Sequence, residues 1–282
     1  MRHVGVARPP LDPTVEENRG VSYVFGHSDR ELERLAAQAA LVDPITREIL
    51  VEAGIAPGMR VVDVGSGIGA VAFLASSLVG EGGSVIGVDR AETAVAEARR
   101  RSEASGIRNV SFEVGDPAEL VFDAPLDAVV GRYVLQFQPD PAGMVRRLAG
   151  HAPGGLVVFH ELDWTGFRSA PPVPAWDRLC RLIVDAVEAG GASTGMGGAL
   201  PSVFAKAGLP APTMRMAALL GAGADSGDVV GRAVRVARTL GLLSPDDPEG
   251  EQLAGQILEQ AAAEASLLLG PSELGAWSRV PG

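Results

Sequence analysis

Apolar runs alternate with helical patterns through the middle of the chain. Strands are expected over residues 60–64, 84–89, 110–114, 126–131 and 155–161. Continuous apolar runs such as residues 128–130 suggest strands that are buried on both faces. Helices are expected between them, over residues 70–78, 92–105 and 141–151. Strand–helix alternation with short connections predicts a parallel sheet with right-handed crossovers.

Both ends of the chain depart from this alternation. Residues 1–20 resemble an irregular arm, and a capping box over residues 28–31 predicts a helix that follows it. Asp43 and Pro44 predict the start of a second helix, which Gly54 closes. Beyond Trp164, helices are expected over residues 175–189, 200–207, 229–240 and 251–268, and strands over 213–219 and 274–280.

Composition narrows the class of protein. The net charge of −11 argues against nucleic acid or an anionic membrane as the main partner. Cys180 is the only cysteine, so no intrachain disulfide is expected and a reducing compartment fits. We see neither a signal-peptide core nor a window near the ~18 apolar residues of a membrane helix, so we expect a cytoplasmic protein.

A glycine-rich turn follows the first expected strand. The sequence Asp63-Val64-Gly65-Ser66-Gly67-Ile68-Gly69 joins that strand to a helix. Such a turn directs backbone N–H groups and a helix N-terminus at a ligand. Glycine permits the positive φ that a tight turn needs and leaves no Cβ in the ligand's way.

Acidic residues end the next two strands. Asp89 lies about 20 residues beyond the last glycine, where an acid can bind ribose hydroxyls, and Asp116 follows the third strand. Either acid could instead be an ordinary turn residue that caps local amides. Because both lie at carboxyl ends of strands, where open α/β sheets bind ligands, we favour a ligand site.

The glycine spacing separates two kinds of cofactor. A dinucleotide site expects Gly-x-Gly-x-x-Gly, whereas this chain has Gly-x-Gly-x-Gly with Asp63 ahead of it. A carboxylate there would repel a pyrophosphate but would suit an ammonium group. S-adenosylmethionine carries an ammonium and a sulfonium and no phosphate, so the pattern favours it over NAD, and an NAD-dependent oxidoreductase is the less favoured alternative.

Five motifs in order resemble those of class I S-adenosylmethionine-dependent methyltransferases, in the small-molecule branch related to ubiquinone and menaquinone biosynthesis. They are residues 63–69, 88–89, 115–116, 127–130 and 153–155. The resemblance implies a Rossmann-like α/β fold with a seven-stranded sheet in the order 3-2-1-4-5-7-6, strand seven being antiparallel. It divides the chain into an N-terminal arm with a lid helix (1–42) and a methyltransferase domain (43–282). That domain has a cofactor half (43–163) and an acceptor half (164–282) with a helical insertion over 224–270.

The resemblance also implies which residues hold the cofactor. The turn packs against the methionine part, Asp89 binds the ribose with Arg90 beside the adenine, and Asp116 binds the adenine amino group. Tyr23 and Gln38 belong to the arm and its helix, which cover the cofactor in related enzymes; Gln38 could equally face solvent. The full expected set is Asp63, Gly65, Ser66, Gly67, Gly69, Asp89, Arg90, Gly115, Asp116, Pro117, Gly131, Arg132, Tyr133, Tyr23 and Gln38.

Two residues at the end of the fifth strand are the candidate catalytic groups. His160 could deprotonate a hydroxyl or amine, or it could be a hydrogen-bonded structural histidine. Glu161 could position a substrate or brace Arg132. Strand alternation directs the two side chains to opposite faces, so we expect only one of them to face the cleft.

Candidate substrate contacts surround these groups. Gln136 follows the fourth strand, as does Tyr133, and His27 on the arm could close the pocket or pack as a staple onto the following helix. An apolar acceptor pocket is expected from Trp164, Phe167 and Met196, whereas Trp176 fits the core better.

The expected activity is methyl transfer from S-adenosyl-L-methionine to an O, N or C atom of a small molecule in specialised metabolism. A cyclase or regulatory module that binds the cofactor without methylating is the alternative. No cluster of His or Cys has metal-ligand spacing, so no metal is expected. We expect a monomer or a homodimer.

Overall fold

The computed structural model describes residues 42–282, apart from 118, 120 and 245–247. Within this range the first helix occupies residues 42–53. Val42 is already helical, so Asp43 lies inside the helix and not at its N-cap as expected. Its carboxylate instead accepts a hydrogen bond from Arg132, 2.8 Å away, on the fourth strand.

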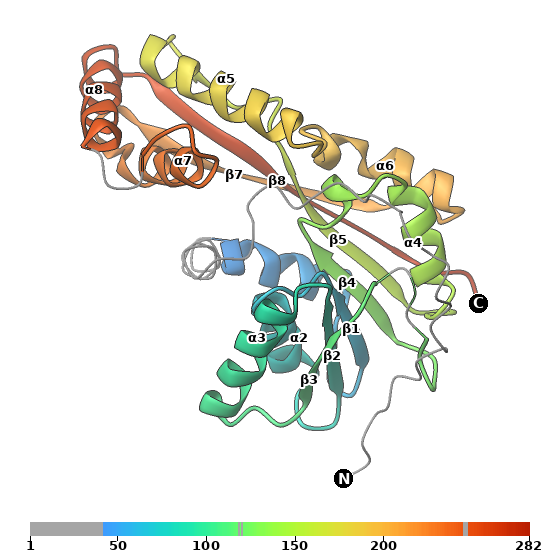
Figure 1. The fold of residues 1–282 in the computed structure, drawn as a ribbon. Helices are drawn as coiled ribbons and strands as arrows, with labels where there is room; N and C mark the ends of the chain where they lie inside the picture. The colour runs from blue at the N-terminus through green and yellow to red at the C-terminus, as the bar shows by residue number, and fades with distance from the viewer. Residues whose placement is uncertain (1–41, 118, 120, 245–247) are drawn as a thin grey trace, which may run out of the picture.

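One mixed sheet forms the centre of the molecule (Figure 1). Its strand order is β3-β2-β1-β4-β5-β8-β6, with β7 also paired to β8. Five strands are parallel: β1 (Arg60–Val64), β2 (Ser84–Asp89), β3 (Val110–Val114), β4 (Ala128–Arg132) and β5 (Leu156–Asp163). The strand β8 (Leu267–Arg279) runs antiparallel to β5, to β7 (Thr213–Ala222) and to the short β6 (Arg168–Ala170). With β7 and β8 as the sixth and seventh expected strands, the predicted order is confirmed and β6 is an addition to it.

Helices cover both faces of the parallel half. The helix over residues 42–53, α2 (Ala70–Val79) and α3 (Glu92–Ser105) share one apolar core with the sheet. On the other face, α4 (Pro141–Ala149) and α6 (Met196–Ala207) form a second core. Alternate residues of β1 enter the two cores, Val61 the first and Val62 the second, as expected of a strand buried on both faces.

A third core lies beyond the carboxyl end of β5. It is made by α5 (Pro174–Ala189), α7 (Gly227–Thr239) and α8 (Glu249–Ala263) packed over the first part of β8. Figure 1 shows these three helices gathered at the far end of the long β7–β8 ladder, away from β1–β3. Since α7 and α8 lie between β7 and β8 in the chain, the insertion expected there is present, closed by the pairing of Ala222 with Leu267.

The last strand differs from its expected range. It begins at Leu267 and not at residue 274, and α8 ends at Ala263. Gly270 and Pro271 argue against a strand in the sequence, because proline cannot donate to a ladder. In the structure these two residues coincide with an irregularity in the β7–β8 register between Ala218 and Leu220, where the ladder is interrupted. The α6 helix also starts early, at Met196 and not at residue 200 as expected.

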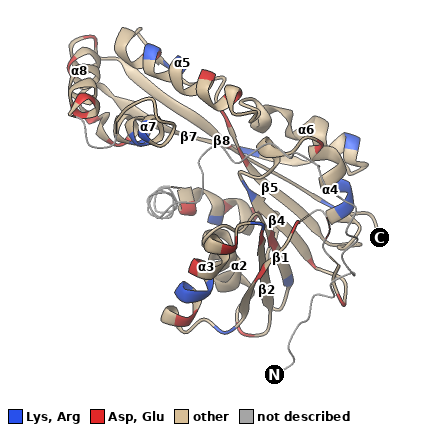
Figure 2. Ribbon diagram, in the orientation of Figure 1, with Lys and Arg blue, Asp and Glu red and all other residues tan. Residues whose placement is uncertain are grey.

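Charged residues lie mainly on the helices and at strand ends, with acids and bases interspersed (Figure 2). The strands carry few charged residues over most of their length, in keeping with their burial, except that β7 is largely exposed. Among the residues that the structure describes, none of the helices combines the length and the apolar character that a membrane span requires.

Candidate active site

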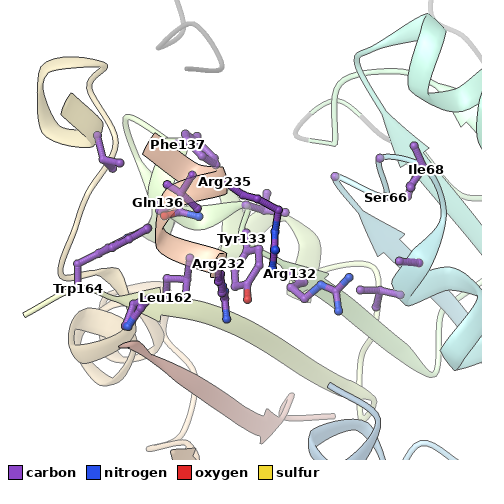
Figure 3. A pocket seen from close by; sticks show the side chains of 18 of the residues that line it. Ser66, Ile68, Arg132, Tyr133, Gln136, Phe137, Leu162, Trp164, Arg232 and Arg235 are labelled. Atoms are coloured by element: carbon purple, nitrogen blue, oxygen red, sulfur yellow. The ribbon is translucent and has the colours of Figure 1, made fainter. Parts of the chain in front are cut away.

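One cavity of about 490 Å³ connects the glycine-rich turn with the insertion. Its first end is formed by that turn and by the carboxyl ends of β2 and β4. Its second end reaches the apolar core under α5, α7 and β8. Figure 3 shows Ser66 and Ile68 at one side of this space, Leu162 and Trp164 at the other, and Arg132 and Tyr133 between them.

Glycine is required at the three positions of the turn for different physical reasons. All have positive φ, 64° at Gly65, 51° at Gly67 and 85° at Gly69. A Cβ on Gly65 would lie 2.5 Å from Val134, and one on Gly69 would lie 2.7 Å from Phe112. A Cβ on Gly67 would meet no protein atom within 4 Å. Gly65 and Gly67 line the cavity and Gly69 does not, so Gly67 leaves the backbone surface that a ligand can approach.

Asp89 lines the cavity and already organises the turn. One carboxylate oxygen accepts from the Gly67 amide at 2.8 Å, and the other accepts from the Ala91 amide at 2.9 Å. A carboxylate has about four acceptor positions, so each oxygen retains capacity for a further donor. The geometry therefore suits the adjacent hydroxyls of a ribose.

Only some of the residues expected near the adenine line the cavity. Arg90 and Pro117 line the cavity, whereas Asp116 and Gly115 do not. The Asp116 carboxylate lies 2.6 Å from the Arg90 guanidinium in an ion pair. Because Arg90 is more than half exposed, this pair contributes little to stability, but it fixes the outer rim of the cavity.

Asp63 is enclosed beneath the turn and does not line the cavity. Neither carboxylate oxygen has a hydrogen-bond partner among the residues that the structure describes. Burial raises the pKa of Asp63 to about 8, although the charge of Arg132 acts in the opposite direction. An enclosed acid of this kind lacks a cationic partner.

The end of β4 forms the middle of the cavity wall. Gly131 does not line it; a Cβ there would lie 2.8 Å from the Phe159 ring, so packing requires this glycine. Arg132 does line it and donates to Asp43 and Thr46, each at 2.8 Å. These bonds hold the guanidinium against the helix over residues 42–53.

Tyr133 has a backbone conformation that side chains rarely adopt, with φ of 58°. Such strain persists only where the surroundings enforce it, and it is concentrated at functional sites. The Tyr133 amide donates to the His160 carbonyl at 2.9 Å, and its hydroxyl donates to Glu273 at 2.5 Å. Burial and the Glu273 carboxylate both raise the pKa of Tyr133, so the hydroxyl stays protonated at neutral pH.

His160 lies behind the cavity wall. It is 2% exposed and does not line the cavity. Its Nδ1 lies 3.1 Å from the Thr46 hydroxyl, and its Nε2 lies 3.0 Å from a Glu273 carboxylate oxygen. The Tyr133 ring, 5.6 Å away between centroids, separates it from the cavity.

Glu161 faces the other side of β5 and braces the turn after β4. One of its oxygens accepts from the Val134 and Leu135 amides at 2.9 and 2.8 Å. Burial raises the pKa of Glu161 to about 7 although these amides lower it. It does not line the cavity, and its contacts are with these amides and not with Arg132. Neither of the two expected catalytic side chains therefore faces the cleft.

Glu273 and Arg232 are site residues that the sequence reasoning missed. The fully buried Glu273 carboxylate accepts from Arg232 at 2.9 Å. Burial alone would raise the pKa of Glu273, but His160, Arg232 and Tyr133 together lower it to about 2. The available signal was a lone acid in a largely apolar stretch, residues 267–280, opposite an arginine beside the apolar stripe of α7.

Most of the expected substrate contacts line the second end of the cavity. Gln136, Trp164 and Phe167 do so. Met196 instead lies in the second core, between α6 and the sheet. Trp176 is fully buried in the third core, made by α5, α7 and α8, as expected. Lining residues not singled out from the sequence include Phe137, Leu162, Ile183, Arg235, Gly270 and Pro271.

Three expected contacts cannot be placed. Tyr23, His27 and Gln38 lie outside the described residues, as does the capping box before the lid helix. Over the described part of the chain, no group of His, Cys, Asp and Glu is arranged to hold a metal ion.

Comparison with known proteins shows that part of the chain is similar to methyltransferases. Residues 55–169 match a family model described as a methyltransferase domain. The aklanonic acid methyltransferase of Streptomyces sp. (strain C5) is 34% identical over 141 residues, which are 49% of this chain and 63% of that protein. The nocamycin O-methyltransferase of Saccharothrix syringae is 36% identical over 107 residues, 38% of either chain. The chain therefore spans less than two thirds of these two relatives.

Solved structures share the fold. A Bacillus halodurans structure named as a methyltransferase covers 84% of this chain and 99% of its own, with 15% identity and a TM-score of 0.56. An N-methyltransferase of Haemonchus contortus, solved with S-adenosylhomocysteine, covers 85% of this chain and 53% of its own, with 18% identity and a TM-score of 0.56. The expected resemblance and the Rossmann-like architecture are confirmed.

Proposed function

We propose that this chain, whose residues 55–169 match the methyltransferase-domain model, transfers a methyl group from S-adenosylmethionine to a small molecule. The observation that supports this most is the cavity of about 490 Å³. It joins the glycine-rich turn and Asp89 to an apolar end, and its whole volume lies in the range of small-molecule sites. One continuous space therefore connects the proposed donor end with the proposed acceptor end.

The residues at the first end fit the cofactor. Gly67 presents bare backbone and Asp89 presents free acceptor positions, which suit a nucleoside with a ribose diol. Asp63 has no hydrogen-bond partner in the described chain but does not line the cavity, so an ammonium group would act on it through its charge and not by direct contact. When bound, S-adenosylmethionine supplies a methyl group that its positive sulfur has already activated.

The chain's own contribution is positioning and exclusion of water. Tyr133 and Arg132 lie at the junction of the two ends, and both are held by hydrogen bonds. Aligning two reactants in this way can remove a large part of a bimolecular barrier. A proton-transfer role for His160 would have to pass through the Tyr133 hydroxyl and Glu273, since His160 itself does not reach the cavity.

The relatives' names support an acceptor in specialised metabolism. One is named for aklanonic acid and the other for nocamycin, the latter as an O-methyltransferase. We extend this class of acceptor to the present chain, with oxygen as the favoured atom, and we keep the expectation of a cytoplasmic enzyme.

Isothermal titration calorimetry on the full chain tests the first part of the proposal. S-adenosylmethionine and S-adenosylhomocysteine should both bind with 1:1 stoichiometry, and NAD⁺ should not. The exposed Asp123→Ala variant is the control, because Asp123 pairs with Arg60 away from the cavity. Binding of NAD⁺ with no binding of either adenosyl compound would contradict the proposal.

A cofactor-binding cyclase or regulatory module is the second candidate. It is favoured by one observation, that neither His160 nor Glu161 faces the cavity. Mass spectrometry of a broad acceptor panel incubated with S-adenosylmethionine separates the two. Tight cofactor binding without any methylated product would favour the second candidate.

A further inference from the structure

The second end of the cavity, which we propose holds the acceptor, is lined by positive charge and, among the described residues, by no carboxylate. Its walls are mainly apolar, among them Leu162, Trp164, Phe167, Ile183, Val187 and Val229. The charged residues that line this end are Arg232 and Arg235, both on α7. Among the described lining residues the single carboxylate is Asp89, at the opposite end.

The two arginines differ in burial, since Arg232 is buried and Arg235 is exposed. Arg232 pairs with Glu273 through one terminal nitrogen, while its Nη1 is buried and has no hydrogen-bond partner among the described residues. Arg235 makes no ion pair with any residue in the described part of the chain, although Arg238, one turn further on, pairs with Glu251. Figure 3 shows Arg235 extending from α7 towards Tyr133 and Arg132.

The buried donor of Arg232 beside apolar walls favours an anionic guest, because a buried donor without a partner is costly unless a ligand satisfies it. Arg235 is exposed to solvent where it lines the cavity, so it contributes by shape and charge, in which guanidinium groups match carboxylates. Building on the proposed function, we propose that the acceptor is a carboxylic acid with a largely apolar ring body, recognised by Arg235 with the aid of Arg232.

A carboxylate acceptor also explains why the expected bases do not face the cavity. With a pKa near 4 it is ionised at neutral pH and needs no proton removed. The acceptor's carboxylate oxygen gives an electron pair to the new O–CH₃ bond as the S–CH₃ bond breaks and sulfur keeps that bond's electrons. The products are a methyl ester and S-adenosylhomocysteine. No proton moves, and the negative acceptor becomes neutral, which an apolar chamber favours.

The test compares matched acid and amide probes on the full chain. Benzoate, 2-naphthoate and anthraquinone-2-carboxylate are each titrated against their carboxamides by calorimetry, with and without S-adenosylhomocysteine. At least one acid should bind about tenfold more tightly than its amide. Arg235→Gln should remove that preference, a loss of about 1.4 kcal/mol per tenfold, and Arg235→Lys should restore part of it.

Arg238→Gln is the matched control, since Arg238 lies on the same helix, pairs with Glu251 and does not line the cavity. It should leave the acid preference intact. Equal affinity of acids and amides across the panel, or no binding of any probe, would overturn the proposal.

A third outcome would reassign Arg235. If Arg235→Gln lowered the affinity for S-adenosylhomocysteine as much as the affinity for the acids, Arg235 would bind the cofactor's own carboxylate. The proposal would then be wrong. Failure of S-adenosylhomocysteine to bind the unsubstituted chain would instead contradict the proposed function. The two failures are therefore distinguishable.

Discussion

At the scale of single residues, the site consists of groups that already serve the fold. Asp89 caps two amides, Glu161 caps two others, and Tyr133 is anchored through its hydroxyl. Each side chain is therefore fixed before a ligand arrives, which lowers the conformational entropy lost on binding. Asp63 is the exception, because nothing in the described chain satisfies it.

Replacing Asp89 with alanine should weaken cofactor binding. It removes both the proposed ribose acceptor and the bond that holds the Gly67 amide. Hydrogen bonds to charged groups contribute about 1.5–3 kcal/mol, so S-adenosylhomocysteine should bind at least about tenfold more weakly in calorimetry. Asp123→Ala serves as the control. Unchanged affinity in Asp89→Ala would show that this acid does not contact the ligand.

Cofactor binding should release a proton from Asp63. The folded-state pKa of about 8 means that the ligand-free acid is mainly neutral at pH 7. A cationic ammonium nearby would lower that pKa, so binding would ionise the acid. The binding heat at pH 7 should therefore depend on the ionisation enthalpy of the buffer, and Asp63→Asn should remove that dependence. Equal heats in phosphate and Tris would place the ammonium elsewhere.

At the scale of elements, the site residues are positioned by the glycine-rich turn and by the packing of β8 against α7. The turn was readable from sequence because its glycines, acids and flanking elements follow rules of local geometry. The β8–α7 pair was not, because the partners Glu273 and Arg232 lie 41 positions apart and only tertiary packing unites them. An arginine beside the apolar stripe of a helix looks solvated until the opposing strand is known.

Gly67→Ala separates backbone strain from ligand contact. Its Cβ would enter open cavity, at a cost of about 1–2 kcal/mol for the left-handed conformation. Gly58→Ala is the matched control, with φ of 87°, open space around its Cβ and no part in the cavity. Urea denaturation should show similar losses of stability for both. Only Gly67→Ala should lose S-adenosylhomocysteine affinity, and equal affinities would remove Gly67 from the site.

The Arg232–Glu273 pair should behave as a coupled unit. Glu273→Gln leaves the buried Arg232 without its ion-pair partner and should cost about 3–5 kcal/mol in unfolding free energy. Arg232→Met should cost less, because Glu273 keeps its contacts with His160 and Tyr133. The double variant should be more stable than the sum of the two losses predicts. Urea denaturation of the four proteins measures this coupling. Additive losses would mean that the two charges are independently solvated.

At the scale of the whole molecule, one strand binds the two halves together. β8 pairs with β5 over residues 272–279, with β6 over residues 267–269 towards the insertion, and with β7 along most of its length. The strand order and the cofactor end followed from the sequence, since alternation, turns and strand-end acids are local signals. The length of β8 and the placement of Met196, His160 and Glu161 did not, because they depend on which faces tertiary packing covers.

This shared strand predicts that ligand binding stabilises the chain as one unit. S-adenosylhomocysteine at 100 times its dissociation constant should add about 2.7 kcal/mol, which corresponds to a rise in Tm of about 5–10 °C. Scanning calorimetry should show one transition that shifts as a whole, with no shift in NAD⁺. A second transition whose temperature does not change with ligand would mean that the insertion unfolds independently.

The closure of the insertion by the Ala222–Leu267 pair has a consequence for protein engineering and for divergence within this fold. The segment leaves the sheet and returns to it at neighbouring positions on adjacent strands. A segment with such adjoining ends can be exchanged for another without altering the strands that carry the glycine turn and Asp89. New acceptors could therefore arise by transplanting this cassette, while the half that binds the donor remains as inherited.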